Sequence, residues 1–423
     1  MARFDSLEAW LTWQERFHPR LIDLGLERAA QVFKRLHPDY SKPLTITVGG
    51  TNGKGSSIAF LEAIYRAQGY KVGTFTSPHI LRYNERIKID GVPVEDTLIC
   101  EAFERIDNVR EDVSLSYFEF GTLAAVDIFS RADLDIQLLE VGLGGRLDSV
   151  NIISADLAII TSICIDHVDW LGGTREAIGQ EKAGIFRANK PAVIGDKNPP
   201  DSLIYAAQEK QTPLSCINKE FDYHKSTDTW EWTSSTQHYT DLPIPALKGQ
   251  HQFNNASSVL MAVTKMQPYL AVDRKAIDSG LQTVKLTGRF QLIEGDIPVL
   301  LDVGHNPQAV KMLAEYLKNN FADKTIHAVF AIMKDKDVSS IIDIMRDVVE
   351  DWFISPINTP RATSETVLQS LFAQKNLNNT MFGFQNLSEA VAAAKKNAKK
   401  DELILIFGSF FLVSEYLTEF KNV

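Results

Sequence analysis

The stretch VGGTNGKGSS, residues 48–57, decides the fold of this chain. It ends a β-branched run, LTITVGG at residues 44–50, and leads into a helical pattern at residues 57–67. Glycines here allow a tight turn in which successive backbone N–H groups point toward an anion. The following helix adds the positive end of its dipole, and Lys54 can reach the terminal phosphates of a nucleotide. The stretch therefore predicts a phosphate-binding loop between a strand and a helix.

The loop departs from the standard Walker pattern at two positions. The first glycine position holds Val48, and Gly55 stands where a Ser or Thr is expected after the lysine. A tight turn with a surface lysine is the alternative, but the strand before the loop and the helix after it favour phosphate binding. We predict that ATP contacts Gly50, Thr51, Asn52, Gly53, Lys54, Gly55 and Ser56.

Strand-like and helical segments alternate on both sides of the loop. Strands that alternate with helices need crossover connections, so a mostly parallel sheet covered on both faces is expected. Residues 1–40 have apolar positions at helical spacing and predict amphipathic helix. The other predicted strands are residues 71–76, 135–141, 157–163 and 190–195, with helices that include residues 121–130 and 174–186.

A change of pattern near residue 288 predicts a second domain. Residues 215–245 alternate polar and apolar side chains and are rich in Thr, Tyr and Trp, which predicts a small antiparallel meander. A helix at residues 255–269 and the segment KLTGRF precede a new alternating set, with strands near residues 299–302, 326–331, 352–354 and 403–407. We predict an α/β fold of two domains: residues 1–288, a P-loop-type, mostly parallel sheet domain with an antiparallel appendage, and residues 289–423, a smaller Rossmann-like α/β domain.

Composition excludes several classes of function. The chain has 423 residues and a formal net charge of −10, which disfavours bulk binding to nucleic-acid phosphates. Its 3 cysteines lie far apart and give no zinc or disulfide framework. Acidic residues interrupt the first apolar segment, and the longest apolar stretch, residues 403–413, is too short to span a bilayer. We expect a cytoplasmic protein that binds neither nucleic acid nor membrane.

The short G-T-x-G-K-x-S loop resembles that of the Mur ligase superfamily, ATP-dependent enzymes that join a carboxylate to an amine. Further segments resemble the dihydrofolate synthase/folylpolyglutamate synthase family, and they follow that family's order over nearly the whole chain. These segments are IDLGLER (residues 22–28), GTNGKGS (50–56), TSPHILRYNERI (76–87), YFEFGTLAA (117–125), EVGLGGRLD (140–148), DHVDWLG (166–172), EKAGIFR (181–187) and DVGHNP (302–307).

The resemblance implies an ATP-dependent ligase that adds L-glutamate to 7,8-dihydropteroate and to reduced folates. The acceptor carboxylate would take the γ-phosphoryl group of ATP, and the glutamate amine would attack the resulting acyl phosphate. The DLG and SYFEFG segments resemble the bifunctional bacterial enzymes, and relatives are mostly monomeric. A folylpolyglutamate synthase alone, or another Mur-type amide ligase, is the alternative.

Two rival functions are weaker. A peptidoglycan Mur ligase has a nucleotide-sugar-binding domain ahead of the loop, and only 48 residues precede Gly49 here. A nucleotide-dependent switch without catalysis would be expected to lack the linker arginine, Arg289, and the D-x-x-H-N-P motif that begins at Asp302. Both are present, so a ligase is favoured.

Phosphoryl transfer needs a divalent cation, and the resemblance assigns its ligands. Glu140 ends a predicted strand, where α/β folds place active-site groups. In the family this glutamate, Ser77 and His167 bind magnesium, although a lone histidine is by itself more often a packed or solvent-facing residue, and imidazole is an unusual magnesium ligand. Lys182 could be an ordinary surface lysine. The resemblance instead implies a carbamylated Lys182 that holds a second Mg²⁺.

The remaining site residues also come from the resemblance. The segment HQFNNAS resembles an H-N-x-x-N motif, with Gln252 in place of the first Asn and Asn255 at the second, which would contact ATP. Arg289 and Asp302 would also bind ATP, and His305 and Ser409 would hold glutamate. The catalytic candidates are Lys54, Lys182, Arg289 and His305. The pterin residues would be Asp23, Leu24, Gly25, Ser116, Tyr117, Phe118, Glu119, Leu147, Asp148 and Ser149, of which Tyr117 and Phe118 would equally suit core packing.

Overall fold

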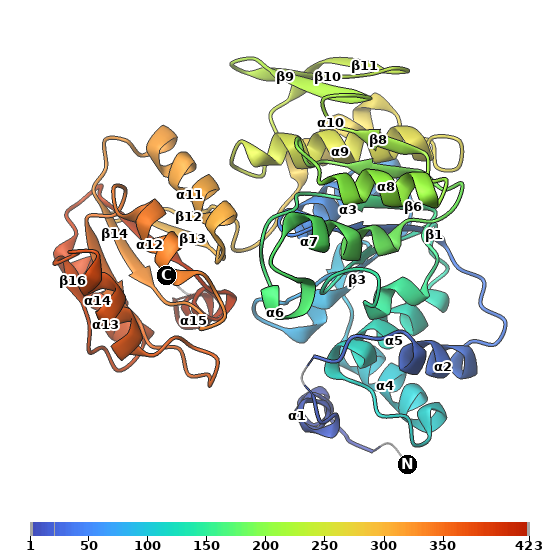
Figure 1. Cartoon of the computed structure of the whole chain (residues 1–423), viewed down its shortest axis with the longest axis horizontal. Helices are drawn as coiled ribbons and strands as arrows, with labels where there is room; N and C mark the ends of the chain where they lie inside the picture. The colour runs from blue at the N-terminus through green and yellow to red at the C-terminus, as the bar shows by residue number, and fades with distance from the viewer. Residues whose placement is uncertain (1–2, 21, 421–423) are drawn as a thin grey trace. The chain divides into compact units, whose positions relative to one another are not determined.

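The computed structural model describes residues 3–20 and 22–420 of the chain. The chain divides into two compact units (Figure 1). The first unit comprises Met1–Ala246 and Gln252–Lys285, and the second comprises Leu247–His251 and Leu286–Val423. Each unit has its own sheet with helices around it, which confirms the predicted α/β fold class.

The first unit is built on an eight-stranded sheet in the order β4-β3-β2-β5-β1-β6-β7-β8. The six strands from β2 to β8 in that order run parallel, as predicted, whereas β3 and β4 form an antiparallel edge that the sequence did not predict because both strands are very short. The central strands are buried on both faces and read as apolar runs. Their bounds are β1 (Leu44–Gly49), β2 (Val72–Phe75), β3 (Ile87–Ile89), β4 (Val92–Pro93), β5 (Ile136–Glu140), β6 (Leu157–Ile160), β7 (Ala192–Ile194) and β8 (Leu214–Cys216).

Helices cover this sheet, and the predicted ranges 1–40 and 174–186 are not helical throughout. The range 1–40, predicted as amphipathic helix, holds two separate helices, because the chain is extended at His18, which precedes Pro19. Residues 1, 2 and 21 of that range lie outside the described residues. Helix α7 ends at Lys182 and continues only as a 3₁₀ turn, since Gly184 packs directly on the backbone of Arg146. The helices are α1 (Leu7–Phe17), α2 (Glu27–Leu36), α3 (Lys54–Gln68), α4 (Asp96–Arg110), α5 (Tyr117–Ser130), α6 (Val168–Leu171), α7 (Arg175–Lys182), α8 (Asp201–Glu209), α9 (His251–Met266) and α10 (Arg274–Thr283).

The antiparallel appendage of the first unit is confirmed. It is a three-stranded sheet of β9 (Phe221–Lys225), β10 (Thr229–Ser234) and β11 (His238–Pro243). Trp230 and Trp232 alternate with exposed residues along β10 and are fully buried. This period of two is the pattern of a sheet with one covered face.

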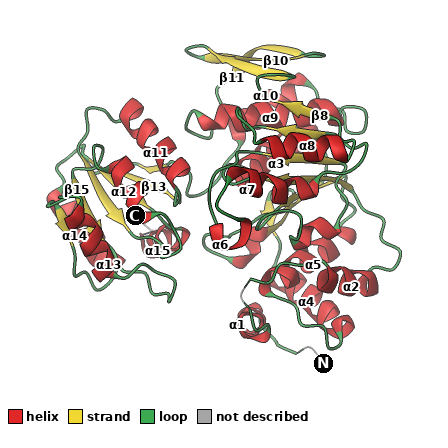
Figure 2. Cartoon of the chain, in the orientation of Figure 1, coloured by secondary structure: helices red, strands yellow, loops and turns green. Residues whose placement is uncertain are grey.

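The second unit has a six-stranded sheet in the order β12-β13-β17-β14-β15-β16 (Figure 2). All neighbours are parallel except β12, which pairs antiparallel with β13. The carboxyl ends of β13 and β17 therefore lie side by side. The elements are β12 (Gln291–Ile293), β13 (Val299–Asp302), β14 (Ile326–Phe330), β15 (Asp351–Ile354), β16 (Thr380–Met381), β17 (Leu403–Phe407), α11 (Pro307–Asn320), α12 (Val338–Met345), α13 (Glu365–Gln374), α14 (Leu387–Asn397) and α15 (Phe410–Phe420).

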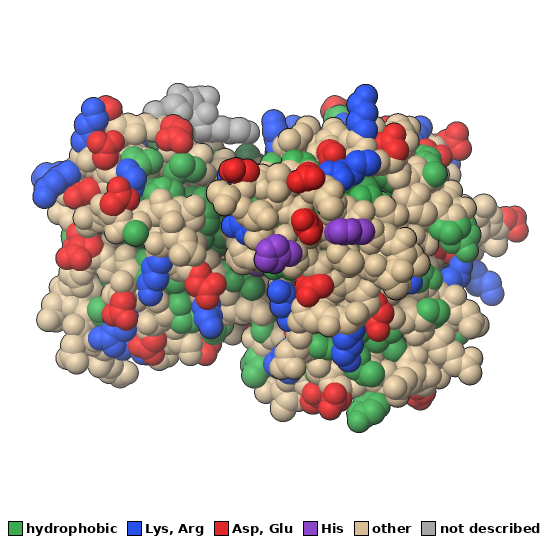
Figure 3. All heavy atoms as spheres, turned by 90° about the horizontal axis from the view of Figure 1, so that it is seen from above, with side chains coloured by type: hydrophobic (Ala, Val, Ile, Leu, Met, Phe, Trp, Pro, Cys, Tyr) green, Lys and Arg blue, Asp and Glu red, His purple; other side chains and the backbone are tan. Residues whose placement is uncertain are grey.

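The surface carries charges of both signs. On the face seen in Figure 3, Lys and Arg side chains are interspersed with Asp and Glu, without a continuous basic patch. Among the described residues, no helix is both long and apolar enough to cross a membrane.

Candidate active site

The predicted phosphate loop joins β1 to α3. Gly50 and Gly53 have φ angles of +138° and +92°, a region that favours glycine. A Cβ on Gly50 would overlap the hydroxyl of Thr161, and a Cβ on Gly53 would lie 2.5 Å from Asn255 Oδ1. Both glycines are thus required by backbone conformation and by close packing.

The segment that follows β6 holds the loop from one side. The N–H of Thr51 donates to Ser162 O at 2.6 Å, and its hydroxyl donates to Cys164 O at 3.1 Å. The hydroxyl of Thr161 donates to Asn52 O at 2.7 Å. The sequence predicts a strand over residues 157–163, whereas β6 ends at Ile160. No motif assigns residues 161–164 to the loop, because they reach it only through the pairing of β1 with β6.

Two lysines share one backbone carbonyl of the loop. Lys54 Nζ donates to the carbonyls of Gly50 and Thr51, both at 3.1 Å, and Lys182 Nζ donates to Gly50 O at 2.9 Å. Lys182 is only 4% exposed, so the alternative of an ordinary surface lysine is wrong. Burial, together with the nearby Lys54 ammonium, lowers the pKa of Lys182 to about 7. Two lysine side chains are therefore held against the turn of the loop, and Lys182 loses its proton more readily than a solvent-exposed lysine.

Glu140 and Ser77 come together at the start of α3. Glu140 is buried at the end of β5, and its Oε2 accepts a hydrogen bond from Ser77 N at 3.0 Å. A Cβ on Gly55 would lie 3.8 Å from the same oxygen, which places the carboxylate beside the phosphate loop. His167 caps α6 with a φ of +53°, and its ring Nε2 lies 4.0 Å from Asp166 Oδ2.

These residues suit a magnesium ion only in part. Within residues 3–20 and 22–420, no three or more His, Cys, Asp and Glu side chains are grouped to hold a metal. The predicted set includes only Glu140 and His167 of these kinds. The carboxylate of Glu140 and the neighbouring Ser77 hydroxyl fit the preference of Mg²⁺ for oxygen. An ammonium at Lys182 would repel a cation, whereas a carbamate there would supply oxygen ligands.

Helix α9 is linked to the loop through the residue that departs from the superfamily motif. Gln252 Nε2 donates to Ser56 Oγ at 3.3 Å, and Asn255 Nδ2 donates to Gln252 Oε1 at 2.9 Å. The longer Gln side chain thereby positions Asn255 over Gly53. The substitution keeps α9 tied to the loop.

The predicted pterin residues come from segments far apart in sequence that meet in the structure. Gly25 N donates to Leu147 O at 3.1 Å, which joins the first segment to the third. Arg28, which is not among the predicted site residues, joins the first segment to the second: its guanidinium lies 2.8 Å from Asp23 Oδ2 and 3.2 Å from Glu119 Oε1. The segments at residues 23–25, 116–119 and 147–149 thus form one assembly.

Aromatic rings line the same region. A Cβ on Gly142 would lie 2.5 Å from Phe118 Cζ, so this ring rests directly on the glycine after β5. The Tyr117 ring packs edge-on against Tyr83 at 5.7 Å, and the Arg86 guanidinium lies 5.6 Å from its centre. Burial raises the pKa of Tyr117 to about 12, so its hydroxyl stays protonated. Tyr117 and Phe118 are half-buried, so each ring is less buried than a core side chain and less exposed than a surface side chain.

Asp148 stabilises the third predicted pterin segment, residues 147–149, by accepting hydrogen bonds from backbone N–H groups. Its carboxylate accepts from Leu143 N at 2.8 Å and from Val150 N at 3.0 Å. Burial raises its pKa to about 6 despite these bonds. Ser149 next to it shares a 2.7 Å hydrogen bond with Thr122 of α5.

In the second unit, Asp302 organises the turn after β13. Its carboxylate accepts from Gly304 N at 2.7 Å and from Phe290 N at 3.2 Å. Burial raises the pKa of Asp302 to about 6, although the Arg289 guanidinium opposes that shift. Arg289 lies over the Phe410 ring at 5.1 Å. Residues predicted from separate motifs therefore gather at the end of β13.

His305 and Ser409 lie at the same edge of the sheet. A 2.8 Å hydrogen bond joins His305 Nδ1 to Val303 O, and the ring centre lies 5.8 Å from that of Phe410. Ser409 is buried, and its hydroxyl accepts from Phe411 N at 3.1 Å. Because β13 and β17 are neighbours, the loops that follow them bring His305 and Ser409, both predicted to bind the glutamate substrate, to one end of the unit.

The chain matches family models over most of its length. The Mur ligase middle domain matches residues 48–263, and the Mur ligase glutamate ligase domain matches residues 288–410. The dihydrofolate synthase/folylpolyglutamate synthase of Escherichia coli K12 is 39% identical over 97% of this chain and 94% of that protein. The chain belongs to the dihydrofolate synthase/folylpolyglutamate synthase family.

Solved structures of this family share the whole fold. E. coli FolC in complex with DHPP and ADP has a TM-score of 0.93 at 38% identity, covering 99% of this chain and 98% of that one. The Yersinia pestis enzyme complexed with AMPPNP and Mn has a TM-score of 0.91 at 37% identity, covering 99% and 98%. The predicted membership of the Mur ligase superfamily and the predicted ligase class are therefore confirmed.

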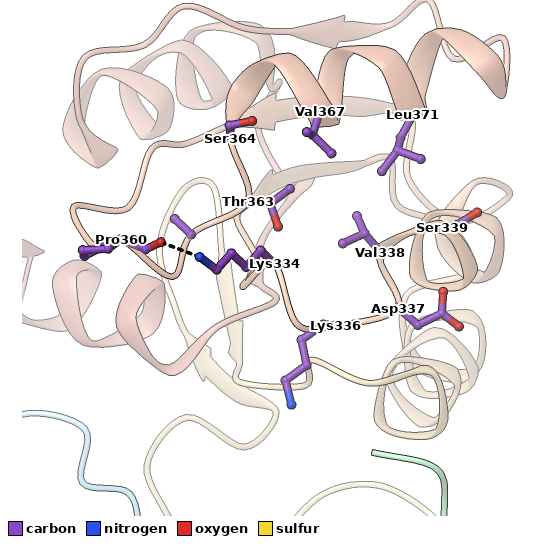
Figure 4. Close-up of a pocket in the computed structure, with 11 residues that line it drawn as sticks. Lys334, Lys336, Asp337, Val338, Ser339, Pro360, Thr363, Ser364, Val367 and Leu371 are labelled. Carbon is purple, nitrogen blue, oxygen red and sulfur yellow. Dashed lines mark hydrogen bonds between the residues drawn. The ribbon is translucent and has the colours of Figure 1, made fainter. Parts of the chain in front are cut away.

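A cavity of about 650 Å³ in the second unit falls outside every family motif (Figure 4). It lies beside the loops that follow β14 and β15. Lys334 on its rim donates from Nζ to Pro360 O at 3.3 Å, and Val338, Val367 and Leu371 form an apolar wall. No sequence motif predicts a role for these residues.

Proposed function

We propose that this chain adds L-glutamate to 7,8-dihydropteroate, forming dihydrofolate, and to reduced folates, extending a polyglutamate chain. The observation that carries the proposal is full-length similarity to relatives named for both activities, combined with a phosphate loop and joined pterin segments in one unit. The folylpolyglutamate synthase of Lacticaseibacillus casei is 29% identical over 87% of this chain, which supports the extension-only alternative less well.

The reaction has two steps. An oxygen of the acceptor carboxylate attacks the γ-phosphorus of ATP, which forms an acyl phosphate and releases ADP. The α-amine of glutamate then attacks the acyl carbon, loses a proton, and expels inorganic phosphate as the amide forms. Lys54 and Arg289 stabilise the negative charge that develops on the phosphoryl oxygens.

The remaining roles follow the family pattern. The loop residues 50–56, with Asn255, Arg289 and Asp302, bind ATP. His305 and Ser409 hold the glutamate, and His305 is the catalytic candidate of the two. The division of function follows the sequence prediction: residues 1–288 carry the phosphate loop and the pterin site, and residues 289–423 form the C-terminal ligase domain.

Glu140, Ser77 and His167 hold Mg²⁺ in this proposal, and a carbamate on Lys182 holds a second ion. When bound there, the metal would neutralise phosphate charge. The carbamate forms when the neutral Lys182 amine adds to carbon dioxide and releases one proton. The buried position of Lys182 beside the loop supports this role. We further propose a cytoplasmic monomer whose partners are ATP, glutamate and the pterin substrates.

Phosphate release from ATP tests the proposal. Purified protein, Mg²⁺, L-glutamate and ATP are incubated with 7,8-dihydropteroate or with tetrahydrofolate. Glutamate-dependent turnover with both is expected. Turnover with tetrahydrofolate alone would make the chain an extension enzyme, and no turnover with either, in protein shown to bind ATP, would contradict the folate assignment.

A further inference from the structure

The connection between α1 and α2 carries the first pterin segment and has no regular secondary structure of its own in its described part. This connection is held in place by contacts with residues outside the segment. Gly25 N donates to Leu147 O, and the Asp23 carboxylate contacts the basic side chains of His18, at the end of α1, and Arg28, in α2. The position of this segment therefore depends on a few side-chain charges rather than on a helix or a strand.

Asp23 has three basic neighbours that differ in what else they contact. His18 Nε2 lies 3.0 Å from its Oδ2, Arg28 Nη1 lies 2.8 Å from Oδ2, and Arg20 Nη1 lies 3.3 Å from Oδ1. The Arg20 side chain is 73% exposed, whereas that of Arg28 is 29% exposed. Arg28 also donates from Nη2 to Asp23 O at 2.8 Å, so it holds both the side chain and the backbone of this residue.

Glu119 gives Arg28 a second carboxylate. Its side chain is 3% exposed, and its Oε2 accepts from Ser116 N at 2.8 Å at the start of α5. Its Oε1 is buried, lies 3.2 Å from Arg28 Nη2, and accepts no hydrogen bond from the described residues. This oxygen therefore retains a lone pair that can accept a hydrogen bond from the N–H of a ligand.

We propose that Arg28 is a positioning and specificity residue: it holds the carboxylates of Asp23 and Glu119 in place, so that the site selects a ring whose edge offers N–H donors. The two carboxylates would repel each other without a cation between them, and a planar guanidinium can contact both at once. The amino-pyrimidinone edge of a pterin has this chemistry, with donors that an ionised carboxylate accepts. The inference rests on the proposed function and extends it to the recognition of the ring.

Kinetics of Arg28→Gln, Arg28→Lys and the matched control Arg20→Gln test the inference. Arg20→Gln removes the same charge from the same aspartate but leaves Glu119 untouched. We expect Arg28→Gln to raise KM for 7,8-dihydropteroate by about tenfold or more, with kcat and KM for ATP nearly unchanged. Arg28→Lys should recover part of the loss, since one ammonium reaches one carboxylate, and Arg20→Gln should behave as wild type.

A pterin that lacks the 2-amino group provides a second measurement: the ratio of its affinity to that of the parent pterin, which would not change if Arg28 had only a structural role. The wild type should bind this 2-desamino analogue more weakly than the parent pterin in a fluorescence titration, and Arg28→Gln should bind the two alike. Equal KM in wild type and Arg28→Gln, an equal rise in Arg20→Gln, or retained discrimination in Arg28→Gln would each overturn the inference.

Folding and the parent function are checked separately. If Arg28→Gln melts below the assay temperature, the same titrations with Arg28→Lys decide, because full discrimination in that variant would contradict the need for a forked donor. A wild type that does not turn over dihydropteroate would overturn the proposed function. The pterin titrations of wild type and variants would still decide the role of Arg28.

Discussion

In the first unit, the phosphate loop and the assembly of the three segments predicted to bind the pterin, the pterin assembly, are built in opposite ways. The loop lies within residues 48–57 and is shaped by glycine backbone angles and by carbonyls that accept from lysines. The pterin assembly joins three distant segments, and its links include side-chain charges on Asp23, Arg28 and Glu119. A local site of this kind fails when backbone space is lost, whereas an assembled site fails when a side-chain link is lost.

The largest effect should come from Gly50→Ala. Its φ of +138° disfavours any side chain, and the new Cβ would overlap Thr161. We expect ATP binding to be lost and kcat/KM to fall by about a thousandfold or more, because displaced phosphates no longer meet the lysines. The control is Gly69→Ala, with a φ of +100° but no atom within 4 Å of the new Cβ. Equal losses in both variants would contradict a loop-specific effect.

Lys182→Ala should have the next largest effect. We expect kcat to fall by about a hundredfold, since a buried charged group beside the phosphates is removed. Short carboxylic acids in the assay should restore part of the activity if the missing group is a carbamate. Lys190→Ala, at a side chain that is 45% exposed and pairs with Asp156, is the control and should leave activity unchanged. Undiminished activity in Lys182→Ala would contradict the carbamate.

Gly142→Ala tests the pterin side of the comparison. The new Cβ would lie 2.5 Å from Phe118 Cζ and should displace that ring. We expect KM for dihydropteroate to rise about tenfold while KM for ATP stays constant. Adding Phe118→Leu should relieve the overlap and recover part of the affinity. A rise in KM for ATP of the same size would show that the two sites are not separable.

The smallest effect concerns Asp23 and pH. Burial alone would raise its pKa, but the His18 hydrogen bond and the charges of Arg28 and Arg20 lower it below the usual 3.8. A carboxyl whose pKa is lower in the folded than in the unfolded state stabilises the fold at every pH above its unfolded-state pKa. This stabilisation is lost as the pH falls through the folded-state pKa. Wild type should therefore melt a few degrees above Asp23→Asn near neutral pH, and calorimetry should show this gap narrowing only below about pH 4. A constant gap would contradict the ion pair.

Much of the fold could be predicted because its signals are local. The apolar runs of β1, β5 and β6, the loop glycines and the alternation around Trp230 and Trp232 all appear within a few residues of one another. The structure differs from the sequence prediction where a local signal is weak or interrupted. The helical pattern is interrupted between α1 and α2, and strands β3 and β4 are too short to show an alternation of apolar and polar residues.

The sequence by itself determined the fold class, the phosphate loop and, through its ordered motifs, the enzyme family. These depend on residue type and spacing along one stretch of chain, which backbone geometry translates directly into structure. The tertiary structure alone decided that Lys182 is buried on the Gly50 carbonyl, that Gln252 ties α9 to Ser56, and that Arg28 bridges two carboxylates. Burial and charge pairing depend on which distant residues become neighbours, and only the packing of strands and helices brings those residues together.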